Sequence, residues 1–547
     1  MWKAAVSVLL LLLLNMDMQV NGAAGEAGGS VAGGPGPETK LKAAEAEAAN
    51  TIPASDTAPA GFLGNLLVVP MDGSHWVGIK AIAEEMGRRG HKVTVVIPEI
   101  SVRMGPGKHY ETVTFPVPYD KAHLDFVMAV HKDVLRKSTQ SFIQNIKAKY
   151  SQIMRITGFI HTTAESLLFN DSLISHLAQQ NFDAVLTDPM IPSGSLIARK
   201  LGLPTINLLR GIPCSLDMKS AGCPSPPSYV PRFLTKYSHV MNFKERTVNT
   251  LVALLEPLLC RLMYWYFDQI AYRFLGEEVG VAEVLSESAI WLLRMDFTLE
   301  FPRPIMPNVV LVGGINCNVR NPLPEDLESW LSGEQGFVVF TLGTMVSDLP
   351  EEITSVLLEA FRQIPQKVIW RYTGKVPDRV PENVKFMTWV PQNDLLAHSG
   401  ARAFITHAGS HGLFEGLCHA VPMLMMLASR NAGLVLDITT ISTESLLQGL
   451  NAVINDTRYK ENMKKLSALH KDRPVDPLDL SVYWTEHVMR HKGAKHLRWA
   501  GRGLNVLQYF SLDVIALLAT IVLVFVILLV KCLKLFIRKV GRKRKQE

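Results

Sequence analysis

The chain has 547 residues, of which 48% are hydrophobic, and a formal net charge of +6 at pH 7. This length exceeds what one hydrophobic core usually holds, so we expect two folded domains with accessory segments. The last 17 residues contain eight Lys or Arg and one Glu, a formal charge of +7, which leaves the remainder near −1. The composition therefore gives no reason to expect a nucleic-acid partner.

The first 60 residues divide into two segments. Residues 1–22, "MWKAAVSVLLLLLLNMDMQVNG", have one lysine, a long apolar run and an end of small residues, which predicts a secretory signal peptide. A buried core helix is the alternative, and it is disfavoured because no polar residue alternates through the run. Residues 23–60 are rich in Ala, Gly, Pro and Glu, so we expect a low-complexity, disordered leader.

Strand and helix patterns alternate from Gly61 onward. "GNLLVVPM", "WVGIKAIAEEMGRRG" and "HKVTVVIP" predict a β-α-β opening, and "FDAVLTDPM", "GSLIARKLG" and "LPTINLL" repeat it. After a Pro-rich crossing, "EFPRPIMPNVVLVGG", the alternation resumes from "FVVFTLG" to "VPMLMM". The sequence therefore predicts an α/β fold with two doubly wound, parallel-sheet domains, which we place at residues 61–310 and 311–500.

A second apolar segment lies near the C-terminus. The 17 residues "VIALLATIVLVFVILLV" carry no charge, and with the residues before them they predict a membrane-spanning helix at 509–530. The basic tail at 531–547 belongs in the cytoplasm, so the bulk of a single-pass, type I protein faces the lumen. The ending "KRKQE" fits a lysine signal for retrieval to the endoplasmic reticulum, although a basic flank that merely stops transfer is the alternative.

Six cysteines in so long a chain do not form a disulfide framework. Cys214 and Cys223 flank a Pro-rich loop and could pair with each other. Asn170 ("NDS") and Asn455 ("NDT") are candidate glycosylation sites in a lumenal protein.

The first candidate site residues stand at the ends of predicted strands. His75 follows the first strand, and Asp188 follows "AVLT". Because the carboxyl ends of parallel strands meet at one edge of a sheet, we expect the pair in a cleft between the domains, where nucleotides bind in such folds. A His–Asp pair suits a general base whose protonated form the carboxylate stabilises. The alternative is that each residue caps the helix that follows it.

The second predicted domain carries a possible nucleotide site. "FITHAGSHGLFEG" predicts a strand, a Gly/Ser turn and a helix, an arrangement whose backbone N–H groups and helix dipole hold phosphate. Trp389 and Gln392 follow another strand, where an indole can stack on a base and an amide can read its edge. Glu415 can accept hydrogen bonds from a ribose. The rival interpretation is a hydrolase, because "AGSHG" imitates a nucleophile elbow with Ser410 as nucleophile.

Several blocks together resemble a known family. They are "VPMDGSHW", "FDAVLTDP", "FPRPIMPNVVLVGGINC", "TLGTMVSDLP", "WVPQNDLLAH", "AFITHAGSHGLFEG" and "ALHKDRPVDPLDLSVYWTEHVMRHKGAKHLR". From about Gly61 to its end the chain resembles the UDP-glucuronosyltransferases, most closely those of vertebrate family 1. The resemblance implies two facing Rossmann-like domains of the GT-B type. It also implies inverting transfer of a sugar from a UDP-sugar to a lipophilic hydroxyl acceptor, without a cofactor. The identity of the sugar, glucuronic acid, is implied by this resemblance alone.

The resemblance also implies roles for individual residues. His75 would deprotonate the acceptor hydroxyl, with Asp188 as its carboxylate partner. Trp389 would stack on the uracil, Gln392 would lie beside it, and Glu415 would hold the ribose. The diphosphate would be surrounded by Thr344, His407, Ser410, His411 and Gly412.

No metal is implied. His487 and His491 stand four residues apart in "EHVMRH", but no third ligand is apparent, and the order is not that of a zinc protease. We expect them on a basic helix that approaches the membrane.

One stretch departs from the family pattern. Where the family continues its strand into "PLFGDQ", whose Asp and Gln hold the sugar hydroxyls, this chain has "LASRNAGLVL", about a dozen residues shorter around 427–433. A parallel connection needs a dozen or more residues, so we expect that the second strand pairs differently, that it leaves the sheet, or that the local fold is damaged, with apolar sheet face exposed. We expect UDP binding with impaired transfer. The alternative is a catalytically defective member that forms homo- or hetero-oligomers with active transferases.

Overall fold

The computed structural model describes most of the chain after the predicted leader. The described residues are 62–135, 142–211, 220–232, 235, 237–318, 321–343, 348–425, 433–436, 438 and 440–543. The predicted signal peptide and leader, Cys214, Thr344 and the connection 426–432 lie outside them. Two compact units are present, residues 1–495 and 496–547, and each is described by itself.

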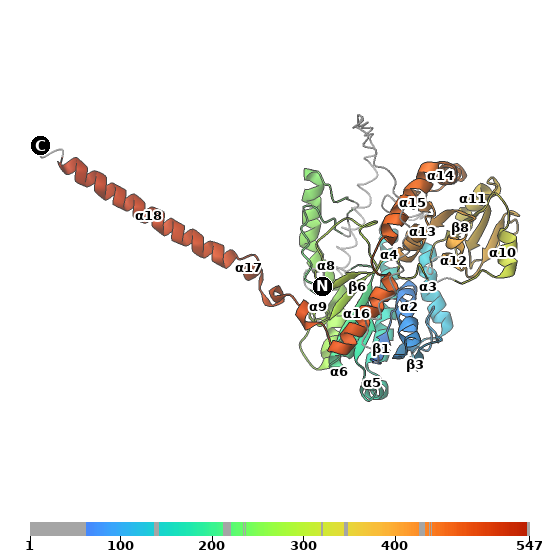
Figure 1. Ribbon diagram of the computed structural model, residues 1–547, viewed down its shortest axis with the longest axis horizontal. Coiled ribbons are helices and arrows are strands. Elements are labelled where there is room, and N and C mark those ends of the chain that lie inside the picture. The colour runs from blue at the N-terminus through green and yellow to red at the C-terminus, as the bar shows by residue number, and fades with distance from the viewer. Residues whose placement is uncertain are drawn as a thin grey trace, which may run out of the picture. The chain divides into compact units, whose positions relative to one another are not determined.

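The first half of the larger unit is built on a seven-stranded parallel sheet in the order β3-β2-β1-β4-β5-β6-β7 (Figure 1). Its strands are β1 (Asn65–Val69), β2 (Lys92–Pro98), β3 (Glu111–Phe115), β4 (Ala184–Thr187), β5 (Thr205–Leu209), β6 (Ile290–Leu293) and β7 (Val309–Leu311). The central strands are almost wholly buried, which is why they read as continuous apolar runs in the sequence.

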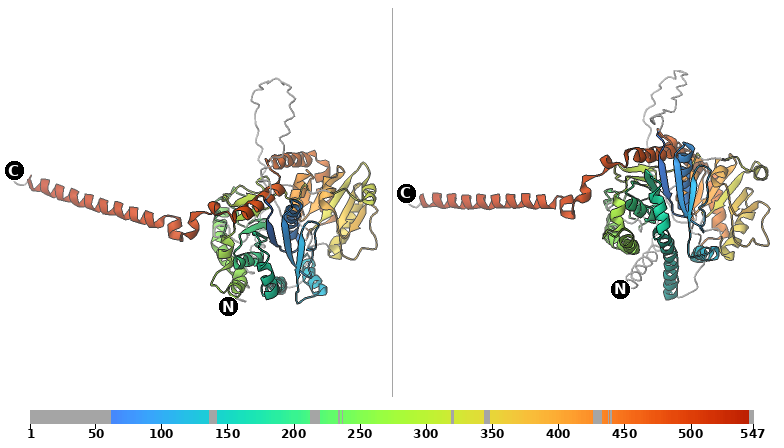
Figure 2. Two further views of the ribbon diagram at one scale, coloured as in Figure 1. Left: turned by 60° about the horizontal axis from the view of Figure 1, so that its bottom comes forward. Right: turned by 90° about the horizontal axis from the view of Figure 1, so that it is seen from below.

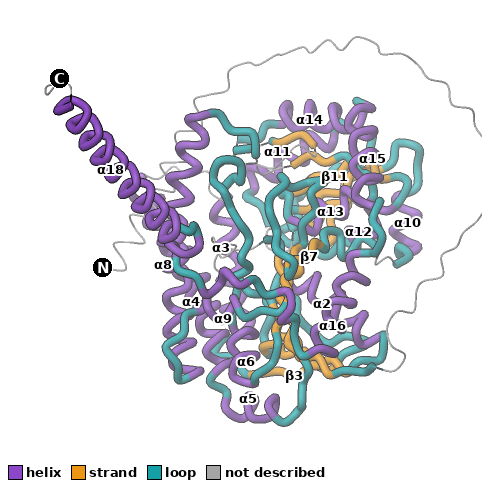
Figure 3. Tube along the Cα trace, turned by 60° about the vertical axis from the view of Figure 1, so that its left-hand side comes forward, coloured by secondary structure: helices purple, strands orange, loops and turns teal. Residues whose placement is uncertain are grey.

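Helices cover both faces of this sheet. The helices of this half are α2 (Ser74–Arg88), α3 (Lys121–Leu135), α4 (Phe142–Leu168), α5 (Asp171–Ala178), α6 (Ser193–Leu201), α8 (Phe243–Leu275) and α9 (Val281–Ser286). Helices α4, α6, α8 and α9 pack together over one face, and α2 packs against β2 and β5. Figure 3 shows strands flanked by helices throughout the unit.

The second half is built on a six-stranded parallel sheet in the order β10-β9-β8-β11-β12-β13. Its strands are β8 (Phe337–Thr341), β9 (Lys367–Arg371), β10 (Val384–Met387), β11 (Ala401–Thr406), β12 (Met423–Met425) and β13 (Gly433–Val435). Its helices are α10 (Glu325–Leu331), α11 (Glu351–Arg362), α12 (Gln392–Ala397), α13 (Ser410–Cys418), α14 (Thr443–Asn455) and α15 (Thr457–Lys471). Figure 2 shows the strands of the first sheet in blue to green and those of the second in yellow to orange.

Helix α16 (Pro477–His491) crosses back to the first half. It falls in the range expected for the second domain, 311–500, yet it packs on α2, β4 and β6 of the first sheet (Figure 1). His91 Nε2 lies 3.2 Å from Glu486 Oε1 across this contact, and both side chains are buried. The helix therefore ties the end of the second half to the first. His487 and His491 lie on α16 with ring centroids 4.5 Å apart.

The short connection after β12 does not prevent parallel pairing. β13 lies next to β12 and parallel to it, with Met423 opposite Gly433 and Met425 opposite Val435. The expectation that the second strand pairs differently or leaves the sheet is therefore wrong. Each strand contributes only three residues, so the chain has to return only about 10 Å along the strand direction, which seven residues can span. Gly433 is required there, because a Cβ would lie 2.0 Å from the Met423 carbonyl oxygen.

The expected exposure of apolar sheet face is also wrong for β12. Met423, Leu424 and Met425 are all fully buried. Leu424 packs in the cluster that contains Leu446 and Leu450 of α14, and the two methionines pack in the cluster formed with α13 and α15. Neighbouring helices thus cover both faces of β12.

The smaller unit contains the apolar C-terminal helix. Its elements are η2 (Lys495–Leu497), η3 (Ala500–Gly503), α17 (Val506–Tyr509) and α18 (Leu512–Lys543). Within α18, Leu512–Arg538 is long and apolar enough to cross a membrane, and an 18-residue window in it has a mean hydropathy of 3.1. The helix begins later than the expected 509, because Ser511 has a positive φ of 52° that separates it from α17. It continues past 530 because Lys and Arg are good helix formers.

Candidate active site between two parallel sheets

His75 and Asp188 lie together at the carboxyl edge of the first sheet. His75 is the second residue of α2, and Asp188 directly follows β4. His75 Nδ1 lies 2.6 Å from Asp188 Oδ2, and Asp188 Oδ1 accepts a hydrogen bond from Met190 N at 2.9 Å. With Nδ1–H donated to the carboxylate, Nε2 keeps its lone pair for a proton.

The structure does not support the helix-cap alternative for this pair. Helix α2 has Gly73 at its N-cap, and α6 has Pro192, and neither helix has a side-chain cap. The Asp188 side chain is only 1% exposed and His75 is 22% exposed. A carboxylate this deeply buried, in direct contact with an imidazole, is the arrangement expected of a general base and its support.

Arg294 is a buried cation beside this pair that the sequence did not point to. It follows β6, and its backbone N–H donates to the Leu209 carbonyl oxygen at 2.7 Å. Burial lowers the pKa of Arg294, whereas the charge of Asp188 acts to raise it. Arginine keeps its proton even so, and the first sheet thus presents a fixed positive charge close to the His–Asp pair.

Three of the proposed uridine contacts lie at the carboxyl edge of the second sheet. Trp389 follows β10 and is 51% exposed, and Gln392 begins α12. Gln392 Nε2 donates a hydrogen bond to Glu415 Oε2 on α13. Burial raises the pKa of Glu415 to about 7, although the hydrogen bond from Gln392 works against that increase. The structure therefore brings Gln392 and Glu415 into direct contact.

His407 follows β11, and two glycines make room for its ring. A Cβ at Gly343 or at Gly409 would lie 2.5 Å from ring atoms of His407, and Gly343 also has a φ of 80°. Burial lowers the pKa of His407 to about 4, with a smaller contribution from Arg210, so the ring is neutral. Its Nδ1 is buried and has no hydrogen-bond partner among the described residues. Ser410 and Gly412 lie in the first turn of α13 beside it.

His411 joins the two halves of the unit. Asn316 Nδ2 donates to His411 Nδ1 at 3.1 Å, so the Nε2–H donates to the Ser74 carbonyl oxygen at 3.0 Å. Arg294 Nη1 also approaches Nε2. Burial, followed by the charge of Arg294, holds the pKa of His411 well below its usual value. The two ring nitrogens are therefore engaged away from Ser410, and His411 cannot serve as the base of a Ser410 nucleophile.

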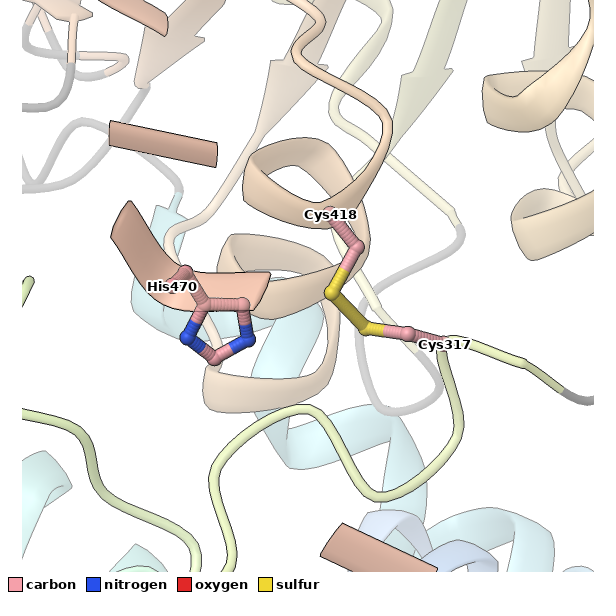
Figure 4. A group of neighbouring side chains, drawn as sticks. All are labelled: Cys317, Cys418 and His470. Carbon is pink, nitrogen blue, oxygen red and sulfur yellow. A yellow bond between two sulfur atoms is a disulfide. The ribbon is translucent and has the colours of Figure 1, made fainter. Parts of the chain in front are cut away.

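A disulfide fixes the far end of the helix that carries Ser410 to Glu415. Cys418, the last residue of α13, is bonded to Cys317, with a Cα–Cα distance of 6.1 Å (Figure 4). The suggested pairing of Cys214 with Cys223 is wrong, because Cys223 is a buried thiol, whereas Cys260 forms a disulfide. The closeness of the two cysteines in the sequence did not predict the disulfide, because a disulfide needs close Cβ atoms rather than close residue numbers.

His470 lies against this disulfide (Figure 4). Cys317, Cys418 and His470 are grouped as metal ligands would be, but the sulfurs are bonded to each other, and a metal needs thiolates. The His470 ring stacks on Phe414 with centroids 5.4 Å apart, and its Nδ1–H donates to Asp296 Oδ2 at 3.0 Å. The group thus supports α13 structurally.

The two sequons lie at helix ends. Asn170 is the N-cap of α5, where its side-chain oxygen accepts a hydrogen bond from Leu173 N at 3.1 Å, and its Nδ2 is not used in that bond. Asn455 is the last residue of α14 and is exposed. Both remain candidate glycosylation sites.

Sequence reasoning missed Arg103, Arg294, Asn316 and Gly343. Arg103 lies in the loop after β2, and its Cζ is 4.1 Å from the centroid of the Trp389 ring. The position of Gly343 in "TLG" at a strand end was the only signal that could have been used, because a strand–Gly turn favours close approach. The three polar residues had no local signal, since their partners are far away in sequence.

The family model described as "UDP-glucoronosyl and UDP-glucosyl transferase" matches residues 64–547. UDP-glucuronosyltransferase 1A1 of Mus musculus is 43% identical over 487 residues, 86% of this chain and 91% of that protein. UDP-glucuronosyltransferase 1A1 of Homo sapiens is 43% identical over 497 residues, 88% of this chain and 93% of that protein.

Solved structures resemble much of this chain. Spinosyn forosaminyltransferase SpnP has a TM-score of 0.52 at 17% identity, covering 78% of this chain and 100% of that chain. A variant of Os79 from O. sativa, in complex with UDP, has a TM-score of 0.50 at 14% identity, with coverages of 78% and 100%. At such low identity the likeness shows the fold, a GT-B arrangement of two parallel sheets with helices on their faces.

Proposed function

Because this chain belongs to the UDP-glucuronosyltransferase family and is a glycosyltransferase that uses a UDP-sugar, we propose that it transfers glucuronic acid to a lipophilic hydroxyl acceptor. The observation that carries the proposal is the 2.6 Å contact between His75 and Asp188, at the edge of the first sheet. We assign the acceptor to residues 61–310 and the UDP-sugar to residues 311–500.

The proposed reaction uses His75 as general base. Its Nε2 takes the proton of the acceptor hydroxyl while the oxygen forms a bond to the anomeric carbon of the sugar. The bond from that carbon to the diphosphate oxygen breaks on the opposite face, and UDP leaves with the electron pair, so the configuration inverts. Asp188 stabilises the imidazolium and keeps the ring in the tautomer with Nδ1–H.

The proposed donor site uses the second sheet. Trp389 stacks on the uracil beside Gln392, and Glu415 accepts hydrogen bonds from the ribose. The first turn of α13 offers backbone N–H groups and the positive end of its dipole to the diphosphate. We assign the remaining contacts to the diphosphate to Thr344, His407, Ser410, His411 and Gly412. The buried, neutral His407 supports this assignment, because its Nδ1 has no hydrogen-bond partner in the described part of the chain and a phosphate oxygen can accept a bond from that atom.

We also propose that transfer is slow. The chain lacks counterparts of the Asp and Gln with which family members hold the sugar, and it has "LASRNAG" there instead. Losing two polar contacts removes about 2–3 kcal/mol of donor positioning. The uracil and diphosphate contacts remain, so UDP itself binds. A catalytically defective partner of active transferases is the second candidate, and this same missing segment favours it.

Equilibrium binding of UDP and turnover of UDP-glucuronate with a phenolic acceptor test the proposal on the purified full chain in lipid nanodiscs. We expect UDP binding, slow turnover, and no turnover in His75→Ala. Inserting the family segment of about a dozen residues after Met426 should raise kcat while leaving UDP affinity unchanged. Turnover at a rate typical of the family would contradict the impairment, and absence of UDP binding would contradict the donor site.

The proposal also covers the location and orientation of the protein in the cell. We propose that α18 anchors the protein in the membrane of the endoplasmic reticulum, with residues 62–495 in the lumen and the basic tail in the cytoplasm. Glycosidase treatment of the expressed protein tests this orientation. A shift in mobility that disappears in Asn170→Gln or Asn455→Gln supports a lumenal location, and a protease-sensitive catalytic unit on intact microsomes would contradict it.

A further inference from the structure

Arg103 reaches from the first half of the unit to the side chains of the proposed uridine site. It stands in the loop after β2, and its guanidinium carbon lies 4.1 Å from the centroid of the Trp389 ring. Burial lowers the pKa of Arg103, although the nearby charges of Asp72 and Glu415 act against that decrease. A cation over an indole face at this distance is an attractive cation–π contact.

The backbone of Arg103 is fixed rather than free. Asp72, three residues before His75, accepts hydrogen bonds at Oδ1 from Arg103 N at 3.0 Å and at Oδ2 from Val102 N at 2.6 Å. The same carboxylate accepts a bond from Gly73 N at 2.6 Å, at the start of α2. The loop that carries Arg103 is therefore tied to the start of α2, the helix that carries the proposed base, and the guanidinium reaches Trp389, which follows a strand of the second sheet.

We propose that Arg103 competes with uracil for the indole face of Trp389 and thereby sets the affinity of the protein for uridine nucleotides. The inference rests on the proposed function, in which Trp389 stacks on the base. A stacked base needs about the same separation from the ring that the guanidinium now has, so both groups cannot lie on one face at once. The Arg371 guanidinium carbon, 5.7 Å from the same centroid, further crowds the ring.

The competition acts on the base and not on the phosphates. A cation–π contact of this kind shifts an equilibrium by about two- to tenfold. Removing the side chain should therefore tighten uridine binding by about that factor. Once displaced, the guanidinium is free to approach the diphosphate of UDP and recover part of the lost contact. We therefore expect the gain for UDP to be equal to or smaller than the gain for uridine.

Calorimetric titration of the full chain in nanodiscs with uridine and with UDP tests the inference. Arg103→Ala should lower the Kd for uridine about two- to tenfold, and Arg103→Gln should do the same because it also removes the cation. Lys108→Ala is the matched control, since Lys108 is an exposed cation in the same loop. It should leave both affinities unchanged.

A double-mutant cycle with Trp389→Leu tests whether Arg103 acts on uridine binding through Trp389. Trp389→Leu alone should weaken uridine binding, and Arg103→Ala added to it should bring no further tightening. An unchanged or weakened uridine affinity in Arg103→Ala, or the same tightening without Trp389, would overturn the competition. Weaker UDP binding with unchanged uridine binding would instead make Arg103 a phosphate contact and overturn it too. If Trp389→Leu leaves uridine and UDP binding intact, the proposed donor site itself is wrong.

Discussion

His75 Nδ1 lies 2.6 Å from Asp188 Oδ2, although 113 residues separate them in the chain. The two side chains meet because β1 and β4 are parallel neighbours in the sheet, with Val69 opposite Thr187, so that the residues after them leave at the same edge. The contact fixes which ring nitrogen carries the proton.

Asp188→Asn should lower kcat by about 10²- to 10⁴-fold, because the amide no longer stabilises the imidazolium or selects the Nδ1–H tautomer. The Kd for UDP should change less than about twofold, since the aspartate belongs to the first sheet. Single-turnover kinetics and calorimetry measure the two quantities. Asp171→Asn, at an exposed helix start, is the control and should change neither. A parallel loss of UDP affinity would show that the aspartate supports the fold rather than the chemistry.

Glu415→Gln should alter the pH dependence of stability. Burial raises the pKa of Glu415 to about 7 from its ordinary value of 4.5. The folded protein therefore holds a proton that the unfolded chain releases, so this contribution to stability is fully present below about pH 4.5 and is lost as pH rises to about 7.

The stabilisation that Glu415 loses between about pH 4.5 and pH 7 amounts to about 3 kcal/mol. Glu415→Gln lacks the titration, so the difference in free energy of unfolding between variant and wild type should grow in favour of the variant as the pH increases. Thermal unfolding between about pH 5 and pH 8 measures this. Parallel curves for the two proteins would show that Glu415 is not protonated in the folded state.

Replacing both Cys317 and Cys418 with Ser should destabilise the larger unit by about 2–4 kcal/mol, because the disulfide closes a loop with a sequence separation of 101. UDP affinity should fall as well, since the bond holds the end of α13. Denaturant unfolding and UDP titration measure the two effects. Cys532→Ser, at an exposed thiol in α18, is the control. Unchanged UDP affinity would show that α13 is held by its packing alone.

Asp296→Asn should cost about 2 kcal/mol. Asp296 Oδ2 accepts bonds from Arg473 Nη2 at 2.9 Å and from His470 at 3.0 Å, which joins the end of β6 to the region after α15. Burial would raise the pKa of Asp296, but the hydrogen bonds from His470 and Thr298 lower it to about 2.

The stabilisation from Asp296 is therefore present above about pH 4 and is lost as pH falls through about 2. Asp296→Asn should therefore begin to unfold in acid at a higher pH than wild type, and the difference in free energy of unfolding between the two proteins should shrink as pH falls through about 2. Acid unfolding followed by circular dichroism measures both. Asp479→Asn, half exposed on α16, serves for comparison. Identical acid transitions in Asp296→Asn and wild type would rule the contribution out.

Most of the strands and helices near the site could be predicted from local patterns. "GNLLVVPM" and "ARAFITH" form buried strands as expected, and "FITHAGSHGLFEG" forms a strand, a turn and a helix. Apolar runs and glycine turns are decided within a few residues, which is why reading along the chain succeeds. Placing His75 and Asp188 at one sheet edge also followed from the strand order of α/β folds.

Three features could not be found in that way. The pairing of β13 with β12 depends on how short both strands are, and the rule for parallel connections describes longer ones. The Cys317–Cys418 bond joins residues brought together only by packing. The crossing of α16 onto the first sheet depends on contacts with α2 and β4 that no local pattern encodes.

The amino-acid sequence alone determined the class of this protein: its alternating α/β pattern, its apolar C-terminal helix, and the order of the blocks that mark its family. Those are properties of short segments, where burial and backbone preference act locally. The tertiary structure decided which side chains meet: His411 with Ser74, Arg103 with Trp389, and His470 with Asp296. Such contacts arise when two sheets close on each other, because the partners are then chosen by three-dimensional proximity and not by position in the chain.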